Sequence, residues 1–197
     1  MKRIANLVAG GFLVFGTLHA SAADILEKFH ARYRTLSSIS MRFAGTDGVS
    51  GSIIARKGGK YRIEAGGRTI TCDGRTVWNA QASTKSVIVN TYKPLSNDVS
   101  LERVFFEIIS VYRSSIVEQT PTGTVLRLTA PQPAAIIANV TSLDLTLDAS
   151  ATVSKIVVAS GPSRITYSIS KLRTNQATPS SLFSYTIPKG WEVLDLR

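Results

Sequence analysis

Cysteine and histidine, the side chains that most often bind metals or serve as nucleophile and base, are nearly absent from this sequence. Its 197 residues include one cysteine, Cys72, and two histidines, His19 and His30. One cysteine cannot form an internal disulfide, and a zinc site normally needs a cluster of cysteine and histidine ligands. We therefore expect no disulfide scaffold, no metal and no cofactor. We also expect Cys72 to be a small buried side chain rather than a reactive thiol.

Residues that could act together as acid and base are also lacking. Asp47, Asp73 and Asp148 fall in predicted turns, where aspartate stabilises the backbone. No nucleophile-elbow motif accompanies His30, and the sequence has no phosphate-binding loop or dinucleotide fingerprint. We therefore expect a protein that is not an enzyme. A hydrolase that uses His30 is the enzymatic alternative.

Long apolar runs are lacking except at the N-terminus. Residues 1–3 are basic at two positions, residues 4–18 are mostly apolar, and residues 20–22 are small. This order is typical of a secretory signal peptide, and the apolar run is too short for a membrane span. We expect cleavage after Ala22, which leaves a single domain over residues 23–197 in the periplasm. The residue directly after the expected cleavage site is not a cysteine, so we expect no lipid anchor.

Acidic residues are outnumbered by basic ones, 13 against 23, which gives a formal net charge of +10. Removal of Lys2 and Arg3 with the signal peptide lowers this charge from +10 to +8. Such an excess attracts nucleic acid, anionic membranes or acidic proteins. Because an exported protein rarely meets nucleic acid, we expect no nucleic-acid partner. Transient contact with an anionic membrane surface, or with an acidic protein, is the expectation instead.

Most of the chain alternates between apolar and polar residues, which is the pattern of β-strands. After a helix expected over residues 24–36, the alternation recurs over residues 39–92. The connections there are short, so neighbouring strands should pair antiparallel. More strands are expected over residues 115–172, and two short ones at 183–187 and 191–194. In total we expect about eleven strands and two main helices.

Residues 101–112 interrupt the strands with a helix that is apolar around much of its circumference, so core or a ligand must cover it. A long antiparallel sheet twists and curls, and the two apolar helices can cover its concave face. The expected fold is therefore α+β: mainly antiparallel β-structure in a strongly curved, incomplete barrel with helices over a hydrophobic concave face. A sandwich and a closed barrel are the alternatives.

Three segments, in this order, resemble strings of the LolA family of periplasmic lipoprotein carriers. Residues 36–43 read LSSISMRF and are similar to the first strand of the family. Residues 70–78 read ITCDGRTVW and are similar to its Asp-Gly-Lys hairpin, and residues 183–193 read FSYTIPKGWEV and are similar to its last segment. The resemblance covers almost the whole chain after the signal peptide.

The resemblance implies an incomplete barrel whose hydrophobic cavity is covered by helices. It implies a soluble, monomeric periplasmic chaperone that carries acylated lipoproteins from the inner to the outer membrane. The implied partners are a lipoprotein-releasing transporter of the inner membrane and an outer-membrane acceptor. A periplasmic binding module for another lipid or glycolipid, or an envelope-sensing domain, is the alternative function.

The resemblance also suggests which residues line the acyl-chain cavity, although each could equally be an ordinary core residue. From the strands these are Met41, Phe43, Ile53, Tyr61, Ile63, Trp78 and Val89, and from the covering helix they are Phe105, Ile108 and Ile109. The family holds its lid with the arginine of an Arg-Pro turn. Here Lys57 stands at that position and Gly58 replaces the proline, and lysine lacks the planar guanidinium. Lid control is therefore assigned to Lys57 together with Arg56.

Overall fold

The structure is a computed structural model, which describes residues 22–94, 101–120, 122–160 and 163–197. The predicted signal peptide lies outside the described residues, apart from Ala22, which begins the first helix. No helix in the described part of the chain is long and apolar enough to cross a membrane.

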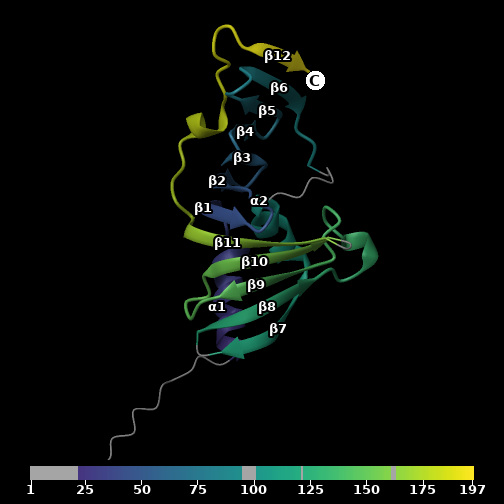
Figure 1. Ribbon diagram of the computed structural model, residues 1–197. Coiled ribbons are helices and arrows are strands. Elements are labelled where there is room, and N and C mark those ends of the chain that lie inside the picture. The colour runs from purple at the N-terminus through teal and green to yellow at the C-terminus, as the bar shows by residue number, and fades with distance from the viewer. Residues whose placement is uncertain (1–21, 95–100, 121, 161–162) are drawn as a thin grey trace, which may run out of the picture.

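The described residues form one large sheet whose strand order is β12-β6-β5-β4-β3-β2-β1-β11-β10-β9-β8-β7 (Figure 1). The two outermost strands, β12 and β7, do not pair with each other, so the sheet is not closed into a barrel. The first half of the chain forms β1 (Ser38–Gly45), β2 (Ser50–Arg56), β3 (Lys60–Ala65), β4 (Arg68–Asp73), β5 (Thr76–Gln81) and β6 (Ser86–Thr91). The second half forms β7 (Arg113–Thr120), β8 (Gly123–Thr129), β9 (Ser142–Leu147), β10 (Val153–Ser160), β11 (Ser163–Thr174) and β12 (Glu192–Asp195). The predicted mainly antiparallel, incomplete barrel is confirmed.

Residues 38–91 pair as predicted, each strand antiparallel to the next. The turn after β4 shows why the sequence folds this way locally. The carboxylate of Asp73 accepts hydrogen bonds from the N–H groups of Arg75 and Thr76, both at 2.8 Å. Gly74 has a φ of +93°, a conformation that side chains other than glycine rarely adopt. Aspartate and glycine thus specify a tight hairpin.

The C-terminal segment differs from the prediction in two ways. The strand predicted over residues 183–187 is wrong, because Ser180–Phe183 form a 3₁₀-helix (η3) and residues 184–191 join no ladder. Tyr185, Ile187 and Trp191 instead pack on the outer face of β5 and β6. An extended segment lying on a sheet gives the same alternation as a paired strand. The final strand, β12, then pairs parallel to β6 at the edge of the sheet.

Helices cover the half of the sheet formed by β7–β11, where the main core lies (Figure 1). Helix α1 (Ala22–Arg34) buries Ile25, Phe29 and Tyr33, which are spaced so that they share one helical face. The ring of Tyr33 lies 5.0 Å from that of Phe29 and 5.6 Å from that of Phe105, centroid to centroid. These rings join α1 to the second helical segment.

The helix predicted over residues 101–112 is present, but its middle is a π-helix. It consists of α2 (Leu101–Arg103), the π-helical segment η1 (Val104–Ile108) and α3 (Ile109–Val111). The N–H of Ile109 bonds to the carbonyl oxygen of Val104, five residues back. We call residues 101–111 the inner helix. A short 3₁₀-helix, η2 (Pro133–Ala135), lies between β8 and β9.

Candidate functional site

The inner face of the first half-sheet is built by side chains that alternate along each strand. Ile53 pairs with Met41 on one side and Ile63 on the other, and Ile63 pairs with Ile70. The next residue in this row is Asn79 on β5. Because paired residues point to the same face of a sheet, these side chains form one continuous surface. This row of paired side chains is apolar from β1 to β4 and becomes polar at Asn79 on β5.

A cavity of about 1110 Å³ lies between this surface and the inner helix. It is larger than the roughly 300–1,000 Å³ typical of small-molecule pockets. The apolar and aromatic part of its wall consists of Phe43, Val49, Ile53, Tyr61, Ile63, Ala65, Ile70, Val77, Tyr92, Pro94, Leu101, Phe106, Tyr167 and Leu196. We call this space the inner cavity.

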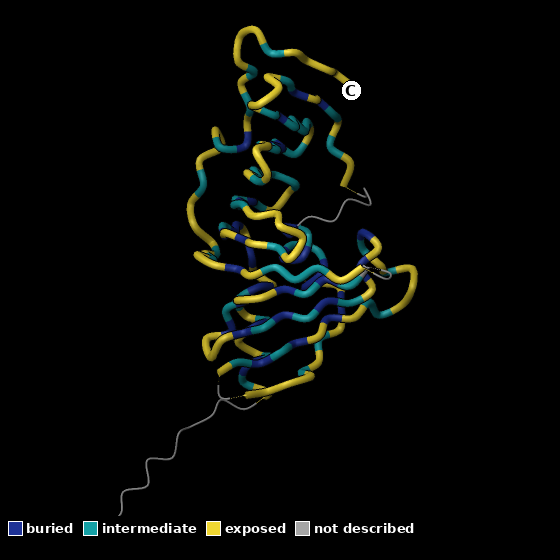
Figure 2. Tube along the Cα trace, in the orientation of Figure 1, coloured by how far each residue is buried: buried dark blue, intermediate teal, exposed yellow. Residues whose placement is uncertain are grey.

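The inner cavity exists because the helices cover only one half of the sheet. Leu126, Leu145 and Ile156 on β8–β10 are completely buried beneath them. Ile70 and Val77, on the uncovered half, are only partly buried. Figure 2 shows this contrast between the buried lower half and the intermediate and exposed upper half. Apolar side chains without a permanent cover are what a binding surface for an apolar ligand requires.

Four of the ten side chains predicted for the cavity wall lie in it: Phe43, Ile53, Tyr61 and Ile63. Four others belong to the buried core and do not reach the cavity wall: Met41, Phe105, Ile108 and Ile109. Consecutive residues of a helix point in different directions, and here Phe105 is fully buried whereas Phe106 lines the cavity.

The remaining two predicted residues, Trp78 and Val89, lie on the other face of the sheet. They pack together with Tyr185 and Trp191 of the C-terminal segment. Strict alternation within β5 and β6 explains the difference, because Val77 and Asn79 line the cavity on either side of Trp78. Alternation alone could have identified Val77, but it could not say which face of the strand was concave.

The two residues assigned to lid control lie at one end of the inner cavity. The backbone N–H of Lys57 donates to the carbonyl of Ser37 at 3.0 Å. A guanidinium nitrogen of Arg56 donates to the carbonyl of Thr178 at 3.4 Å. Neither residue forms an ion pair with another described residue. Control of a lid by Lys57 or Arg56 stays a prediction.

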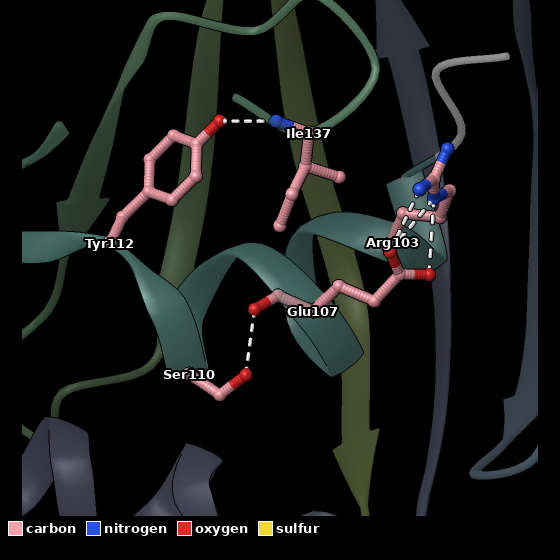
Figure 3. A network of polar contacts seen from close by, with 5 residues as sticks. All are labelled: Arg103, Glu107, Ser110, Tyr112 and Ile137. Atoms are coloured by element: carbon pink, nitrogen blue, oxygen red, sulfur yellow. Dashed lines mark hydrogen bonds and ion pairs between the residues drawn. The ribbon is translucent and has the colours of Figure 1, made fainter. Parts of the chain in front are cut away.

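The inner helix contributes an ion pair to the cavity wall (Figure 3). Nη2 of Arg103 lies 2.8 Å from Oε2 of Glu107, and Nε donates to both carboxylate oxygens at 3.1 Å. The hydrogen bonds to Glu107 raise the pKa of Arg103 above its ordinary value. The hydroxyl of Ser110 donates to the backbone carbonyl of Glu107 at 2.7 Å. The two charged residues of this pair lie one helical turn apart.

The charged residues of the cavity wall lie together on the side of the sheet where several of its strands end. This side contains the ends of β2, β6 and β12 and the turn from β2 into β3, and the inner helix begins beside it. The basic wall residues here are Arg56, Lys57, Lys60, Lys93, Arg103 and Arg197. We call this part the basic end of the cavity. The opposite end is lined by Phe43, Val49, Ala65 and Tyr167, so the cavity is amphipathic along its length.

A close contact shapes the basic end. An ideal Cβ placed on Gly59 would lie only 2.5 Å from Cε1 of Tyr92, so glycine is required here for space as well as for its φ of +74°. The ring of Tyr92 also lies edge-on to that of Tyr61, with centroids 6.4 Å apart. The chain after β6 thus lies against the turn between β2 and β3, although three strands separate β6 from β2 in the sheet.

Neither His30 nor Cys72 is among the residues that line the inner cavity, although Cys72 is paired with Tyr61 and Val77, which do line it. Nε2 of His30 lies 3.0 Å from the hydroxyl oxygen of Ser114, but its buried Nδ1 has no hydrogen-bond partner among the described residues, so none of their carboxylates orients the ring. Cys72 is buried, which raises the pKa of its thiol to about 11 and keeps it protonated. No cluster of potential metal ligands occurs among the described residues. What the site can do, on this geometry, is bind an apolar or amphipathic molecule.

No protein-family model and no curated protein matches this chain. Among solved structures, an uncharacterized conserved protein from Thermus thermophilus is 12% identical over 88% of this chain and 98% of that chain, with a TM-score of 0.53. LprF from Mycobacterium bovis is 10% identical over 88% of this chain and 100% of that chain, with a TM-score of 0.40. Lipoprotein LppX from Mycobacterium tuberculosis is 14% identical over 81% and 100%, with a TM-score of 0.36. At these identities the likeness to the Thermus protein supports the fold alone.

Proposed function

We propose that the protein is a periplasmic carrier which binds the acyl chains of lipoproteins in the inner cavity and shields them from water. The observation that carries this proposal is the cavity of about 1110 Å³ between an uncovered apolar half-sheet and the inner helix. Each methylene group transferred from water to an apolar surface gains about 0.8 kcal/mol. Several acyl chains therefore gain enough to stay bound, and no covalent step is needed. The proposal treats the protein as a binding protein and not as an enzyme.

The proposed route follows from the sequence resemblance. The carrier is exported by its signal peptide, acts as a monomer, receives its cargo from an inner-membrane transporter and delivers it to an outer-membrane acceptor. Its cargo must be bound reversibly, because a carrier that never releases its ligand cannot deliver it. The partial cover over the cavity supports such reversible binding, since only one half of the sheet is permanently packed.

The test uses a synthetic triacylated lipopeptide and the purified protein. Native mass spectrometry should detect a one-to-one complex, and the protein should keep the lipopeptide in solution after centrifugation. Ile70 lines the cavity without belonging to the main core, so Ile70→Asn should weaken binding about fivefold or more by placing an amide against the acyl chains. Ile54→Asn is the matched control, because Ile54 is also partly buried but does not line the cavity.

The outcomes separate the parts of the proposal. Binding that fails for the lipopeptide and for free fatty acid alike would refute an acyl-chain site. Binding of fatty acid or phospholipid without the lipopeptide would refute lipoprotein cargo and favour the alternative, a module for another lipid. Equal effects of the two isoleucine substitutions would place the ligand somewhere other than the inner cavity.

A further inference from the structure

We propose that the inner cavity selects acyl lipids with an anionic headgroup, and that Lys57, Lys60 and Lys93 at its basic end bind that headgroup. This inference rests on the proposed function, because it takes the apolar part of the cavity to hold acyl chains. It adds the chemical class of the ligand. A phosphodiester lipid such as a phosphatidylglycerol is the simplest member of that class.

The cavity wall carries more basic than acidic side chains. Six basic side chains line the cavity, against two carboxylates, those of Glu102 and Glu107. Glu107 is bound by Arg103, and Glu102 is 8% exposed. The excess is therefore positive where a ligand would lie. All six basic residues are at one end, so the charge is concentrated and not spread around the rim.

Lys57, Lys60 and Lys93 are available to a ligand. None of them forms an ion pair with another described residue. Lys57 and Lys93 are exposed, and Lys60 is partly buried. The other basic residues of this end are already bound. Arg103 is paired with Glu107, Arg197 is paired with Asp195 at 2.7 Å, and Arg56 donates to a backbone carbonyl.

The fold brings the three lysines together. Lys57 and Lys60 flank the two glycines of the turn between β2 and β3. The ring of Tyr92 lies against Gly59 of that turn, so Lys93, the next residue, is held beside it. Lysine binds phosphate as a compact positive charge without a demand for fork geometry, which suits three flexible side chains around one headgroup.

The cavity imposes one orientation on an amphiphilic ligand. The end far from the lysines is lined by Phe43, Val49 and Tyr167, and it carries no charged wall residue. An amphiphile therefore fits in one direction only, with its chains toward this end and its headgroup at the lysines. A neutral or zwitterionic headgroup would leave the lysines unneutralised, and so would bind less tightly.

The experiment compares two lipids with identical acyl chains, phosphatidylglycerol and phosphatidylcholine, each presented to the full-length mature protein in non-ionic detergent. Native mass spectrometry and a fluorescent fatty-acid displacement assay give the two affinities. We expect phosphatidylglycerol to bind about tenfold more tightly at low salt, with the preference decreasing as salt increases. In the triple variant Lys57→Gln, Lys60→Gln, Lys93→Gln the preference should fall below about twofold, chiefly because phosphatidylglycerol binds less tightly.

The matched control neutralises three lysines elsewhere. The variant Lys155→Gln, Lys171→Gln, Lys189→Gln has the same net charge, its three positions are exposed, and none lines the cavity. It should keep the tenfold preference. Ile70→Asn should weaken both lipids equally, and glycerol phosphate without acyl chains should not compete.

If the protein binds lipid, three results would overturn the inference. They are equal affinity of the native protein for both lipids, a preference that survives in the Lys57, Lys60 and Lys93 variant, and a loss of preference in both triple variants. The last would mean that net charge and a lipid surface, rather than this end of the cavity, cause the selectivity. Binding of neither lipid would also overturn it, and the lipopeptide assay would then decide whether the proposed function fails as well.

Discussion

Arg103 and Glu107 lie one helical turn apart on the inner helix, and their charged groups contact each other at 2.8 Å (Figure 3). The side chain of Arg103 is only 12% exposed, so its charge depends on this carboxylate more than a surface arginine would. The ion pair therefore stabilises the helix that walls the cavity from within that helix.

A double-mutant cycle tests this ion pair. Arg103→Met should lower the free energy of unfolding by about 1–3 kcal/mol, because Glu107 then loses its charged hydrogen-bond donor. Glu107→Met should also be destabilising, and the double variant should be less unstable than the sum of the two, with a coupling of about 1 kcal/mol. Urea unfolding measures all four proteins. Additive effects would show that the contact contributes nothing to stability.

Gly59 and Tyr92 provide a second prediction. Gly59→Ala should destabilise the protein by about 2–4 kcal/mol, because alanine must adopt a positive φ and must also displace the ring of Tyr92. Gly58→Ala is the control, since Gly58 has a φ of +94° but no atom within 4 Å of an added Cβ. Thermal unfolding should rank Gly59→Ala below Gly58→Ala. Adding Tyr92→Leu should recover part of the difference only in the Gly59 variant.

The hydroxyl of Tyr112 holds the loop before β9 against the end of the inner helix. It accepts a hydrogen bond from the N–H of Ile137 at 2.9 Å and donates one to the carbonyl of Val140. Tyr112→Phe should cost about 1–3 kcal/mol of stability, because two backbone groups lose a buried partner. Tyr185→Phe is the control, as no hydrogen bond of the Tyr185 hydroxyl to a described residue occurs. Denaturant unfolding should separate the two, and equal stabilities would contradict the assignment.

His30 should make stability depend on pH. Burial, with the positive charge of Arg34 adding to it, holds the pKa of His30 below its ordinary value of 6.5. The unfolded chain therefore takes up a proton near pH 6.5 that the folded chain takes up only at lower pH. Because the unfolded state binds more protons in this range, stability falls as the pH drops below 6.5.

The variant His30→Gln isolates this effect, since glutamine cannot titrate and can still hydrogen-bond to Ser114. Its free energy of unfolding should rise relative to that of the native protein as the pH is lowered from about 8 to about 5. Carboxylates such as Asp144 titrate in both proteins and cancel in the comparison. Urea unfolding across the range is the measurement, and a pH-independent difference would contradict the pKa shift.

The sequence was sufficient for the strands because each one carries its own signal. Alternation predicted the pairing of residues 38–91, and Asp73 with Gly74 predicted the hairpin after β4. It failed at residues 183–187, where the same alternation arises from an extended segment packed on the sheet. It also could not reveal the π-helical turn, because five-residue spacing depends on how the inner helix packs.

The candidate site was only partly predictable for a related reason. Phe43, Ile53, Tyr61 and Ile63, which the resemblance suggested, line the cavity. Trp78 was also assigned to the cavity wall, yet it lies on the opposite face. The amphipathic character of the cavity depends on which strand ends share an edge. That is a property of the sheet order and not of any local string.

The pairing of β1 with β11 has a consequence for how the chain folds. Ile39 is paired with Thr174, and all of β2–β10 lie between these two strands in the sequence. The hairpins of each half involve local contacts and can form early, whereas the pairing that joins the halves must close a very long loop. Tyr167 on β11 and Arg197 after β12 also line the cavity, so its wall is completed only when the last strands are present. On the proposed export route, a partly exported chain cannot enclose a ligand, and completion of the site waits until the whole polypeptide has crossed the membrane.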